Sequence, residues 1–272
     1  MSTPIVSPEL RGALKRLKLG YLIDVLPQRL LLADKQDMSF DELLLVLLTD
    51  EIGRRDSTAA TRRAQQAGLD PDMQIERWDK TAKVHFDKRL LAELASLRFI
   101  EAHRHVLVLG PVGVGKTFLA SALGHLACRH GYQVLLRRSD ALLRELRQSR
   151  LDNSREALMA KLCSVDVLII DDFALEPMTR EESRDIYQLF IERTGRASTI
   201  VTSNRDTSEW LTTFDDILLA QSAVDRFKNA AYDLIIEGES FRARLKPMLK
   251  LDDPPPPEPI RKPPHHPRRQ RR

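Results

Sequence analysis

The sequence has few of the features that are typical of secreted proteins or of membrane-spanning proteins. Its 272 residues include two cysteines, Cys128 and Cys163, which are too few for a disulfide framework or a cysteine-based zinc site. Its longest clean apolar run, Leu43–Leu48, is far shorter than the roughly 18 residues that a membrane-spanning helix needs. Residues 1–10 lack the basic-then-apolar order of a secretion signal. We therefore expect a cytoplasmic protein with no membrane partner.

Excess positive charge is also scarce outside one segment. The net charge is +4, from 43 Lys and Arg against 39 Asp and Glu. Residues 251–272 carry six basic and three acidic residues, which leaves 37 against 36 in the first 250. Attraction to nucleic acid must therefore come from this tail or from local patches. Eight of the fifteen prolines lie in the same tail, so we expect it to be disordered, as a solvated tail or as a phosphate-binding arm.

The first part of the chain has the pattern of a small helical domain. Apolar residues from Leu14 to Leu26 follow a helical rhythm, which Pro27 is expected to interrupt. Ser39 and Glu42 form a capping box before the next apolar run. The stretch 68–71, Gly-Leu-Asp-Pro, then ends the pattern. We predict an all-α domain over residues 1–70.

From about residue 76 the pattern changes to alternating strands and helices, after an amphipathic helix at 87–101. Short buried strands separated by helices are typical of a parallel sheet with helices on both faces. We therefore predict an α/β domain over 71–250, followed by the tail at 251–272. The strands are expected at 106–109, 133–137, 166–170, 198–202 and 234–236, and the helices at 116–130, 140–162, 180–194 and 216–231.

A phosphate-binding loop follows the first of these strands. Residues 110–117, Gly-Pro-Val-Gly-Val-Gly-Lys-Thr, match the pattern G-x-x-x-x-G-K-[ST] in full and open a helix. The loop N–H groups and the helix N-terminus favour phosphate. Lys116 is expected at the β- and γ-phosphates, and the Thr117 hydroxyl at Mg²⁺. The predicted nucleotide-binding residues are Gly110, Pro111, Val112, Gly113, Val114, Gly115, Lys116, Thr117 and Phe118.

Three polar residues are predicted to complete this site. The apolar strand 167–170 ends in Asp171 and Asp172, and ligands of open parallel sheets bind at the ends of strands. We expect Asp171 to hold Mg²⁺ and Asp172 to orient or deprotonate the water that attacks a phosphoanhydride. Asn204, after the strand 199–203, is expected to hold the same water. Asp172 is one methylene shorter than the Glu usual in related ATPases, so slow unstimulated turnover is expected.

The order and spacing of five motifs resemble those of the IstB-type ATP-binding proteins, and the resemblance covers nearly the whole chain. These proteins are the transposition helper ATPases of bacterial insertion sequences, AAA+ proteins related to the DnaC helicase loaders. The motifs are the loop 110–117, Ile169-Ile-Asp-Asp172, Thr202-Ser-Asn204, Asp225-Arg226-Phe227 and Gly238-Glu-Ser-Phe-Arg242.

The resemblance implies a fold and further site residues. The fold is a P-loop AAA+ domain with a five-stranded parallel sheet. Asn204 corresponds to sensor 1, and Arg226 to an arginine finger that reaches the ATP of a neighbouring subunit. Arg242 corresponds to sensor 2, on the nucleotide of its own subunit.

The resemblance also implies a function on DNA. IstB-type proteins assemble on double-stranded DNA in an ATP-dependent manner and recruit a transposase to it. The cofactors are then ATP and Mg²⁺, and the partners are duplex DNA, the transposase and further copies of the chain. DNA contacts are expected among Arg144, Arg147, Arg150 and Arg155. The alternative for these arginines is a solvated helix face balanced by Glu145 and Asp152.

Three other functions are compatible with the loop motif. A helicase loader of the DnaC type shares the ATP site but prefers single strands. A small-molecule kinase needs an acceptor pocket, and has no need of Asn204 and Arg226 at these places. A DNA-binding scaffold would bind ATP without turnover, which the short Asp172 makes conceivable.

Overall fold

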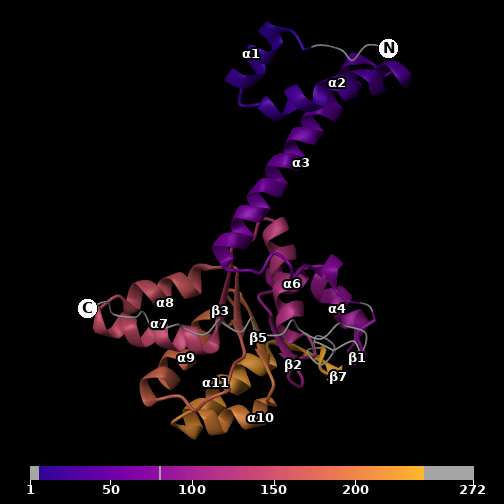
Figure 1. Cartoon of the computed structure of the whole chain (residues 1–272). Coiled ribbons are helices and arrows are strands. Elements are labelled where there is room, and N and C mark those ends of the chain that lie inside the picture. The colour runs from indigo at the N-terminus through magenta and orange to yellow at the C-terminus, as the bar shows by residue number, and fades with distance from the viewer. Residues whose placement is uncertain (1–5, 80, 242–272) are drawn as a thin grey trace, which may run out of the picture.

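A computed structural model describes residues 6–79 and 81–241 of the chain. Its first part is helical, with α1 (Pro8–Arg16), α2 (Gly20–Lys35) and α3 (Phe40–Ala67) following one another (Figure 1). The predicted capping box begins α3, because the Ser39 N–H donates to Glu42 Oε2 at 2.8 Å. Gly68, with φ of 79° in the left-handed region, ends the helix. Both ends are confirmed.

The expected interruption at Pro27 is wrong, since α2 continues through it. A proline costs a helix one hydrogen bond, but tertiary packing can outweigh that loss. Leu22 and Leu26 before the proline and Leu30 after it pack in one small core with Leu47 of α3. Apolar burial on both sides of Pro27 therefore holds the helix together.

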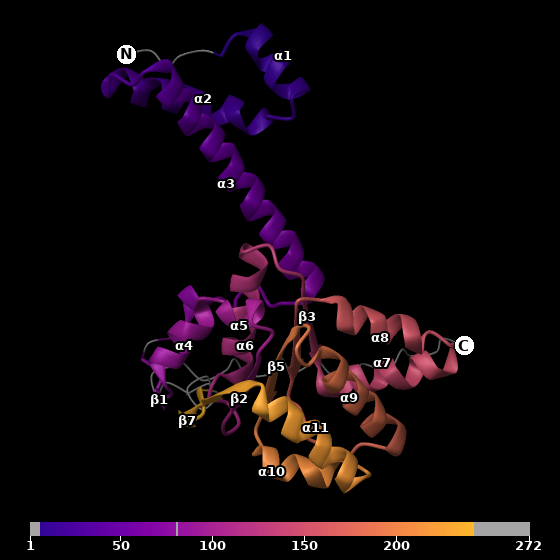
Figure 2. The same cartoon turned by 180° about the vertical axis from the view of Figure 1, so that it is seen from behind.

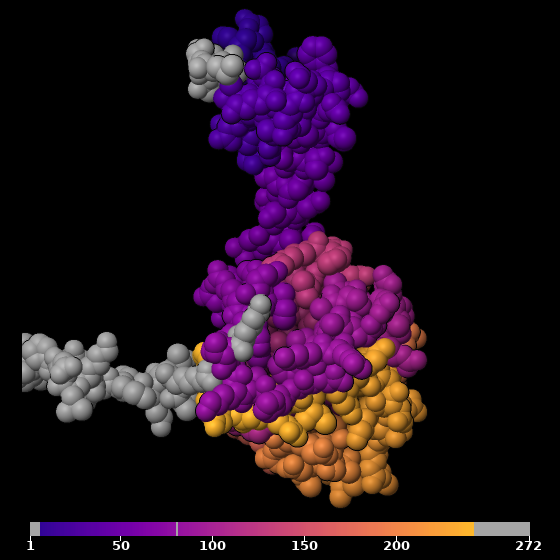
Figure 3. All heavy atoms as spheres, turned by 90° about the vertical axis from the view of Figure 1, so that its right-hand side faces the viewer, coloured from indigo at the N-terminus to yellow at the C-terminus, as the bar shows by residue number. Residues whose placement is uncertain are grey.

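The long helix α3 connects this small core to the rest of the molecule. Its last turns contribute Ala64 and Ala67 to the large core on one face of the sheet, together with Leu69. Arg63 donates to the carbonyl of Cys128 at 2.8 Å. Figure 3 shows the N-terminal lobe standing away from the body at the end of the α3 column. The division at residue 70 stays a prediction, because α3 belongs to both cores.

Five strands form a parallel sheet in the order β3–β4–β5–β2–β6. The first four predicted strands lie within one residue of the observed ones at each end, but β6 begins earlier than predicted. Of its first three residues, Ala231 is half-buried and Tyr232 and Asp233 are exposed at the sheet edge, so apolar content does not mark them. The strands are β2 (His105–Leu109), β3 (Val134–Arg138), β4 (Val167–Asp171), β5 (Ser198–Ser203) and β6 (Ala231–Ile235).

Helices cover both faces of the sheet, as predicted (Figure 2). Alternate strand residues point to opposite faces, so Val106 and Ile169 join one core while Leu107 and Leu168 join the other. The first face carries α4 (Lys88–Ala95), α5 (Arg98–Glu101) and α6 (Lys116–Arg129), and the second carries α7 (Ser139–Leu151), α8 (Arg155–Ser164), α9 (Arg180–Arg193), α10 (Thr207–Trp210) and α11 (Ile217–Asn229).

Two predicted helices are each divided in two. The helix expected at 140–162 breaks between α7 and α8, where Asn153 has φ of 60° and the Ser154 N–H donates to Asp152 at 3.0 Å. The helix expected at 87–101 breaks at Leu97, with φ of 63°. A single left-handed residue cannot continue an α-helix, and helical periodicity does not reveal it.

Further short elements were not predicted. β1 (Val84–His85) pairs antiparallel with β7 (Glu237–Gly238), and two 3₁₀ turns are η1 (Ile75–Arg77) and η2 (Leu211–Thr213). These pieces are too short to produce a sequence period. Among the residues that the structure describes, no helix has the length and apolar content to cross a bilayer. The predicted disorder of the tail at 251–272 lies outside the described residues.

A candidate nucleotide site at the edge of the sheet

The predicted loop lies where β2 ends and α6 begins. Gly115, with φ of 99°, is the last residue before the helix. At Gly110 a Cβ atom would lie 2.1 Å from the carbonyl oxygen of Ile236, so only glycine lets the end of β6 pack here. Lys116 is buried, and its Nζ donates to the carbonyl of Pro111 at 2.8 Å. The lysine therefore reaches back across the loop that is expected to hold phosphates.

A hydroxyl and carboxylate network joins β4, β5 and the first turn of α6. Thr117 Oγ1 donates to Asp171 Oδ1 at 2.9 Å, and Thr202 Oγ1 donates to the same oxygen at 2.6 Å. The Asp172 N–H in turn donates to Thr202 Oγ1 at 2.9 Å. β5 lies between β4 and β2 in the sheet, which brings these residues together. The role of Thr202 is absent from the sequence-based prediction.

Burial raises the pKa of Asp171, and the neighbouring charge of Asp172 adds to the rise. Hydrogen bonds from Thr202 and Thr117 act in the opposite direction. A cation beside this carboxylate would favour its charged form. The network therefore suits a positively charged ligand.

The donor set fits Mg²⁺ bound together with a nucleotide. Thr117 and Asp171 offer hard oxygen ligands side by side. Within the described part of the chain, no group of three or more His, Cys, Asp and Glu is placed to hold a metal ion. Mg²⁺ in nucleotide sites uses one or two protein ligands and completes its shell with phosphates and water. The two oxygen ligands here match that pattern.

The loop, Asp172 and Asn204 line one pocket of about 510 Å³. Its opposite wall comes from the segment before β2, which includes Trp78 and Asp79 and was not predicted to take part. Trp78 packs edge-on against Phe118, with ring centroids 5.3 Å apart. A Cβ atom at Gly115 would lie 2.8 Å from the Trp78 ring. The Trp78 ring therefore packs directly against the phosphate-binding loop.

The end of the described chain crosses the same loop. The pairing of β7 with β1 brings residues 237–238 beside 84–85. The Phe241 N–H then donates to the carbonyl of Gly113 at 2.8 Å, and Phe241 lines the pocket. Gly113 has φ of 85°, in the left-handed region, and a Cβ atom there would lie 2.1 Å from Ser240 Oγ, so this position favours glycine too. Arg242, predicted as sensor 2, lies outside the described residues.

A model of the IstB-like ATP binding protein family matches residues 12–248. The chain belongs to this family. It is 36% identical over 245 residues to an insertion-sequence ATP-binding protein of Mycobacterium tuberculosis, covering 89% of this chain and 97% of the relative. It is 35% identical over 238 residues to the IS21 insertion-sequence ATP-binding protein of Pseudomonas aeruginosa, covering 88% and 90%. The family resemblance predicted from the motifs is confirmed.

Solved structures support the AAA+ fold of this IstB-like chain. The DnaI structure superposes with a TM-score of 0.52 at 22% identity, covering 60% of this chain and 90% of DnaI. Replication initiator DnaA, bound to AMPPCP and single-stranded DNA, gives 0.51 at 22% identity, covering 63% and 51%. At this level of identity the likeness concerns the fold alone. The predicted fold class is confirmed.

Arg226 does not line the nucleotide pocket found in the described part of its own chain. It is exposed on α11, and the lining residues identified among 6–79 and 81–241 do not include it. The next residue, Phe227, is buried and stacks on His105 and Phe190, with ring centroids 4.4 and 4.5 Å apart. This stacking anchors α11 to the core, directly beside the exposed Arg226.

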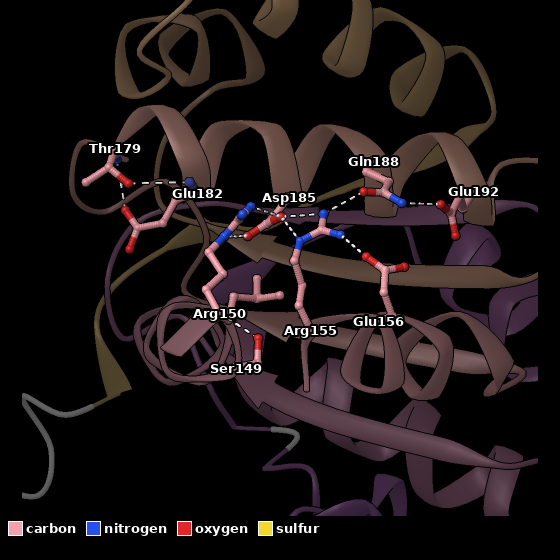
Figure 4. Close-up of polar contacts among 10 residues, drawn as sticks. Ser149, Arg150, Arg155, Glu156, Thr179, Glu182, Asp185, Gln188 and Glu192 are labelled. Carbon is pink, nitrogen blue, oxygen red and sulfur yellow. Dashed lines mark hydrogen bonds and ion pairs between the residues drawn. The ribbon is translucent and has the colours of Figure 1, made fainter. Parts of the chain in front are cut away.

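The four arginines predicted to contact DNA divide into two pairs. Arg150 and Arg155 both donate to Asp185 of α9 at 2.6 Å, and this carboxylate is only 1% exposed (Figure 4). Arg147 pairs with Glu182 at 3.2 Å, and Arg144 with Asp140 at 3.0 Å. The side chains of Arg144 and Arg147 are 61% and 57% exposed, against 35% and 20% for Arg150 and Arg155.

The expected charge partners, Glu145 and Asp152, do not pair with these four arginines. Glu145 pairs with Arg137 at 3.0 Å, and Asp152 accepts from Ser154. The partners instead lie mainly on α9, which packs against α7 and α8 in the folded chain. Sequence proximity could not reveal this, because Asp185 is 30 residues from Arg155.

Proposed function

We propose that this chain is an ATPase that assembles on duplex DNA and recruits a transposase for insertion-sequence transposition. One observation carries the proposal: the loop, Asp172 and Asn204 share one pocket, beside the bonded pair Thr117 and Asp171. The relatives named as insertion-sequence ATP-binding proteins support the biological setting. The assignment as an ATPase rests on the presence of groups for both phosphate binding and water activation.

The proposed reaction is attack of water on the γ-phosphorus of ATP. The backbone of residues 110–115 and Lys116 hold the β- and γ-phosphates. Thr117 and Asp171 would hold Mg²⁺, which neutralises phosphate charge when bound. Asp172 and Asn204 line the same pocket and orient the water, with Asp172 as the acceptor of its proton. The bond to the β–γ bridging oxygen breaks, releasing ADP and phosphate.

The exposure of Arg226 on α11, outside the residues that line the pocket, supports a role in trans. An arginine on the transferred phosphoryl group is worth roughly 10³ to 10⁵ in rate. Supplied by a neighbouring subunit, it would make hydrolysis depend on assembly. ATP would then join subunits around DNA, and hydrolysis would let them part. Arg242 is proposed as sensor 2 on the same basis as before, namely its place in the motif Gly238-Glu-Ser-Phe-Arg242.

Among the four arginines proposed to contact DNA, we assign phosphate binding to Arg144 and Arg147. Their side chains are the most exposed of the four, and Arg144 pairs with the half-exposed Asp140, which phosphate can replace. Arg150 and Arg155 instead hold Asp185 and so position α7 and α8 on α9. The basic tail at 251–272 remains a second proposed source of phosphate contacts.

The first experiment measures binding to matched duplex and single-stranded DNA, with and without ATP, by sedimentation. The chains are the wild type, Arg226→Ala and the control Lys228→Ala, an exposed cation on the same helix. Cooperative, ATP-dependent binding to duplex that only Arg226→Ala abolishes supports the proposal. A preference for single strands would identify a helicase loader instead. A lack of ATP-linked binding to either DNA would overturn both functions.

A further inference from the structure

The lining of the nucleotide pocket has two chemically different parts. The phosphate-binding loop, Asp172 and Asn204 form one part, and the segment before β2 supplies most of the other. A nucleotide is elongated, so when its phosphates lie on the loop its base must contact lining residues outside the loop. We call the part that the segment supplies the 73–84 wall; its residues are Met73, Arg77, Trp78, Asp79, Ala82 and Val84.

Trp78 gives the 73–84 wall a flat apolar surface. Its ring packs edge-on against Phe86 and Phe118, with ring centroids 5.8 and 5.3 Å apart. Both partners are half-buried against the core on the α6 face of the sheet, so their contacts hold the indole in place. An aromatic ring held in this way is a stacking surface for a purine. Stacking by itself does not distinguish one purine from another, because every base has a π face.

Two residues of this wall carry a charge, and they have different partners. Arg77 pairs with Asp72, whose side chain is 78% exposed and does not line the pocket. Asp79 is half-buried, and its Oδ1 accepts from the Thr81 N–H at 2.7 Å and from Thr81 Oγ1 at 2.6 Å. The Ala82 N–H also donates to the Asp79 carbonyl at 3.1 Å. A tight turn therefore holds the Asp79 carboxylate at the pocket.

The Asp79 carboxylate is suited to a hydrogen-bond donor on a base. An ionised carboxylate only accepts hydrogen bonds, and it can take about four of them. It therefore attracts an amino group and repels a carbonyl oxygen, whose lone pairs would face its own. Adenine carries an amino group at C6, whereas hypoxanthine and guanine carry an oxygen there. A carboxylate facing C6 therefore favours adenine over both of the other purines.

We propose that Asp79 selects adenine by accepting a hydrogen bond from its 6-amino group while the ring stacks on Trp78. The two residues are adjacent in the chain and line the same pocket, so they contact the edge and the face of one base together. A site that hydrogen-bonds a substrate group strongly rejects an analogue that lacks the group. The inference rests on the proposed function, because it takes ATP as the nucleotide. It adds the residue that distinguishes ATP from other purine nucleotides.

Calorimetric titration of the full-length wild type with three nucleotides tests this selection. ADP, inosine diphosphate and purine riboside diphosphate carry an amino group, an oxygen and a hydrogen at C6, and none of them is consumed by the proposed reaction. ADP should bind at least about tenfold more tightly than either analogue, as expected for a hydrogen bond to a charged group. Equal affinities would overturn this inference alone. A chain that bound neither ATP nor ADP would overturn the proposed function as well.

Asp79→Asn tests the carboxylate itself, with circular dichroism as the check on folding. Asparagine keeps an oxygen for Thr81 but offers an NH₂ group that donates to the inosine oxygen. The preference for ADP over inosine diphosphate should fall to about one or reverse, and the penalty for purine riboside diphosphate should disappear. Asp72→Asn is the matched control, because it removes a carboxylate of the same segment from outside the pocket, and it should keep the wild-type preference. An unchanged preference in Asp79→Asn, or an equal loss in both variants, would show that Asp79 does not select the base.

Discussion

Thr202 Oγ1 donates a 2.6 Å hydrogen bond to Asp171 Oδ1, and so links the strand β5 to the carboxylate proposed to hold Mg²⁺. The same hydroxyl accepts from the Asp172 N–H at 2.9 Å. A single buried side chain therefore orients both acidic residues of the site. This geometry makes Thr202 a positioning residue, although it touches neither nucleotide nor water in the proposed mechanism.

Thr202→Val should slow ATP hydrolysis about tenfold and raise the Mg²⁺ concentration needed for half-maximal rate. Valine keeps the shape of threonine but leaves Asp171 with Thr117 as its hydroxyl donor and removes the acceptor of the Asp172 N–H. The same loss should cost about 1–2 kcal/mol of stability. Thr202→Ser, which retains the hydroxyl, should keep the wild-type Mg²⁺ dependence. If both variants showed the same Mg²⁺ dependence, the positioning role would be excluded.

Trp78 should report nucleotide binding by its fluorescence. It lines the pocket and packs on Phe118, whereas Trp210, the other tryptophan, is fully buried and donates to Ser203. Titration with ATP should therefore change the emission of the wild type, and Trp78→Phe should remove the change. Trp78→Ala should also weaken ATP binding about tenfold, because stacking on a base contributes roughly 1–3 kcal/mol. A full signal in Trp78→Phe would contradict this placement.

His105 should make stability depend on pH. The ring is buried, accepts from the Thr199 N–H at 3.1 Å and stacks on Phe227. Burial, and then the charges of Arg193 and Arg104, lower the pKa of His105 to about 4 from an ordinary 6.5. The folded chain therefore keeps this ring neutral under conditions where the unfolded chain protonates it.

The contribution of neutral His105 is fully present above pH 6.5 and is lost as the pH falls toward about 4, by about 3 kcal/mol in total. Urea unfolding between pH 4 and 7.5 measures it. His105→Gln, which can still accept a hydrogen bond, should be less stable at pH 7 and should lose stability less steeply as the pH falls. Equal slopes for the two chains would show that other groups control the acid dependence.

Arg155→Ala and Arg144→Ala should separate stability from DNA binding. Arg155 bonds to the buried Asp185, so its removal should lower the free energy of unfolding by about 2 kcal/mol, with Arg150 still in place. Arg144 is exposed, and its removal should leave thermal unfolding unchanged. Arg144→Ala should instead weaken duplex binding and reduce the salt dependence of the affinity by about one phosphate contact. Unchanged binding and salt dependence would remove Arg144 from the proposed DNA surface.

Much of the nucleotide site was predictable because its parts are local. The loop 110–117 encodes its own backbone turn through its glycines, and the apolar strands before it and before Asp171 identify themselves by composition. Parallel strands bring their carboxyl ends to one edge, so Asp171, Asp172 and Asn204 could be placed near the loop without coordinates. The confirmed strand positions and the shared pocket agree with that reasoning.

The contacts that Trp78 and Phe241 make with the phosphate loop were not predictable, because these residues come from distant segments of the chain. Trp78 meets Gly115, and Phe241 meets Gly113, through contacts that leave no local period. The small β1–β7 pair that guides Phe241 has two residues in each strand, below the length at which alternation can be seen. Leu97 and Asn153, the left-handed residues that divide two helices, could not be predicted for a similar reason.

The sequence by itself determined the family, the phosphate loop, the strand positions needed to place the acidic pair, and the helical nature of the first part of the chain. It did so because glycine spacing, capping and apolar periodicity act between near neighbours. Only the tertiary structure decided that Arg150 and Arg155 serve a buried Asp185, that Thr202 holds Asp171, and that the segment before β2 lines the nucleotide pocket. Those outcomes depend on which surfaces meet once the chain is folded. Burial then decides how strongly each of the two polar contacts stabilises the structure.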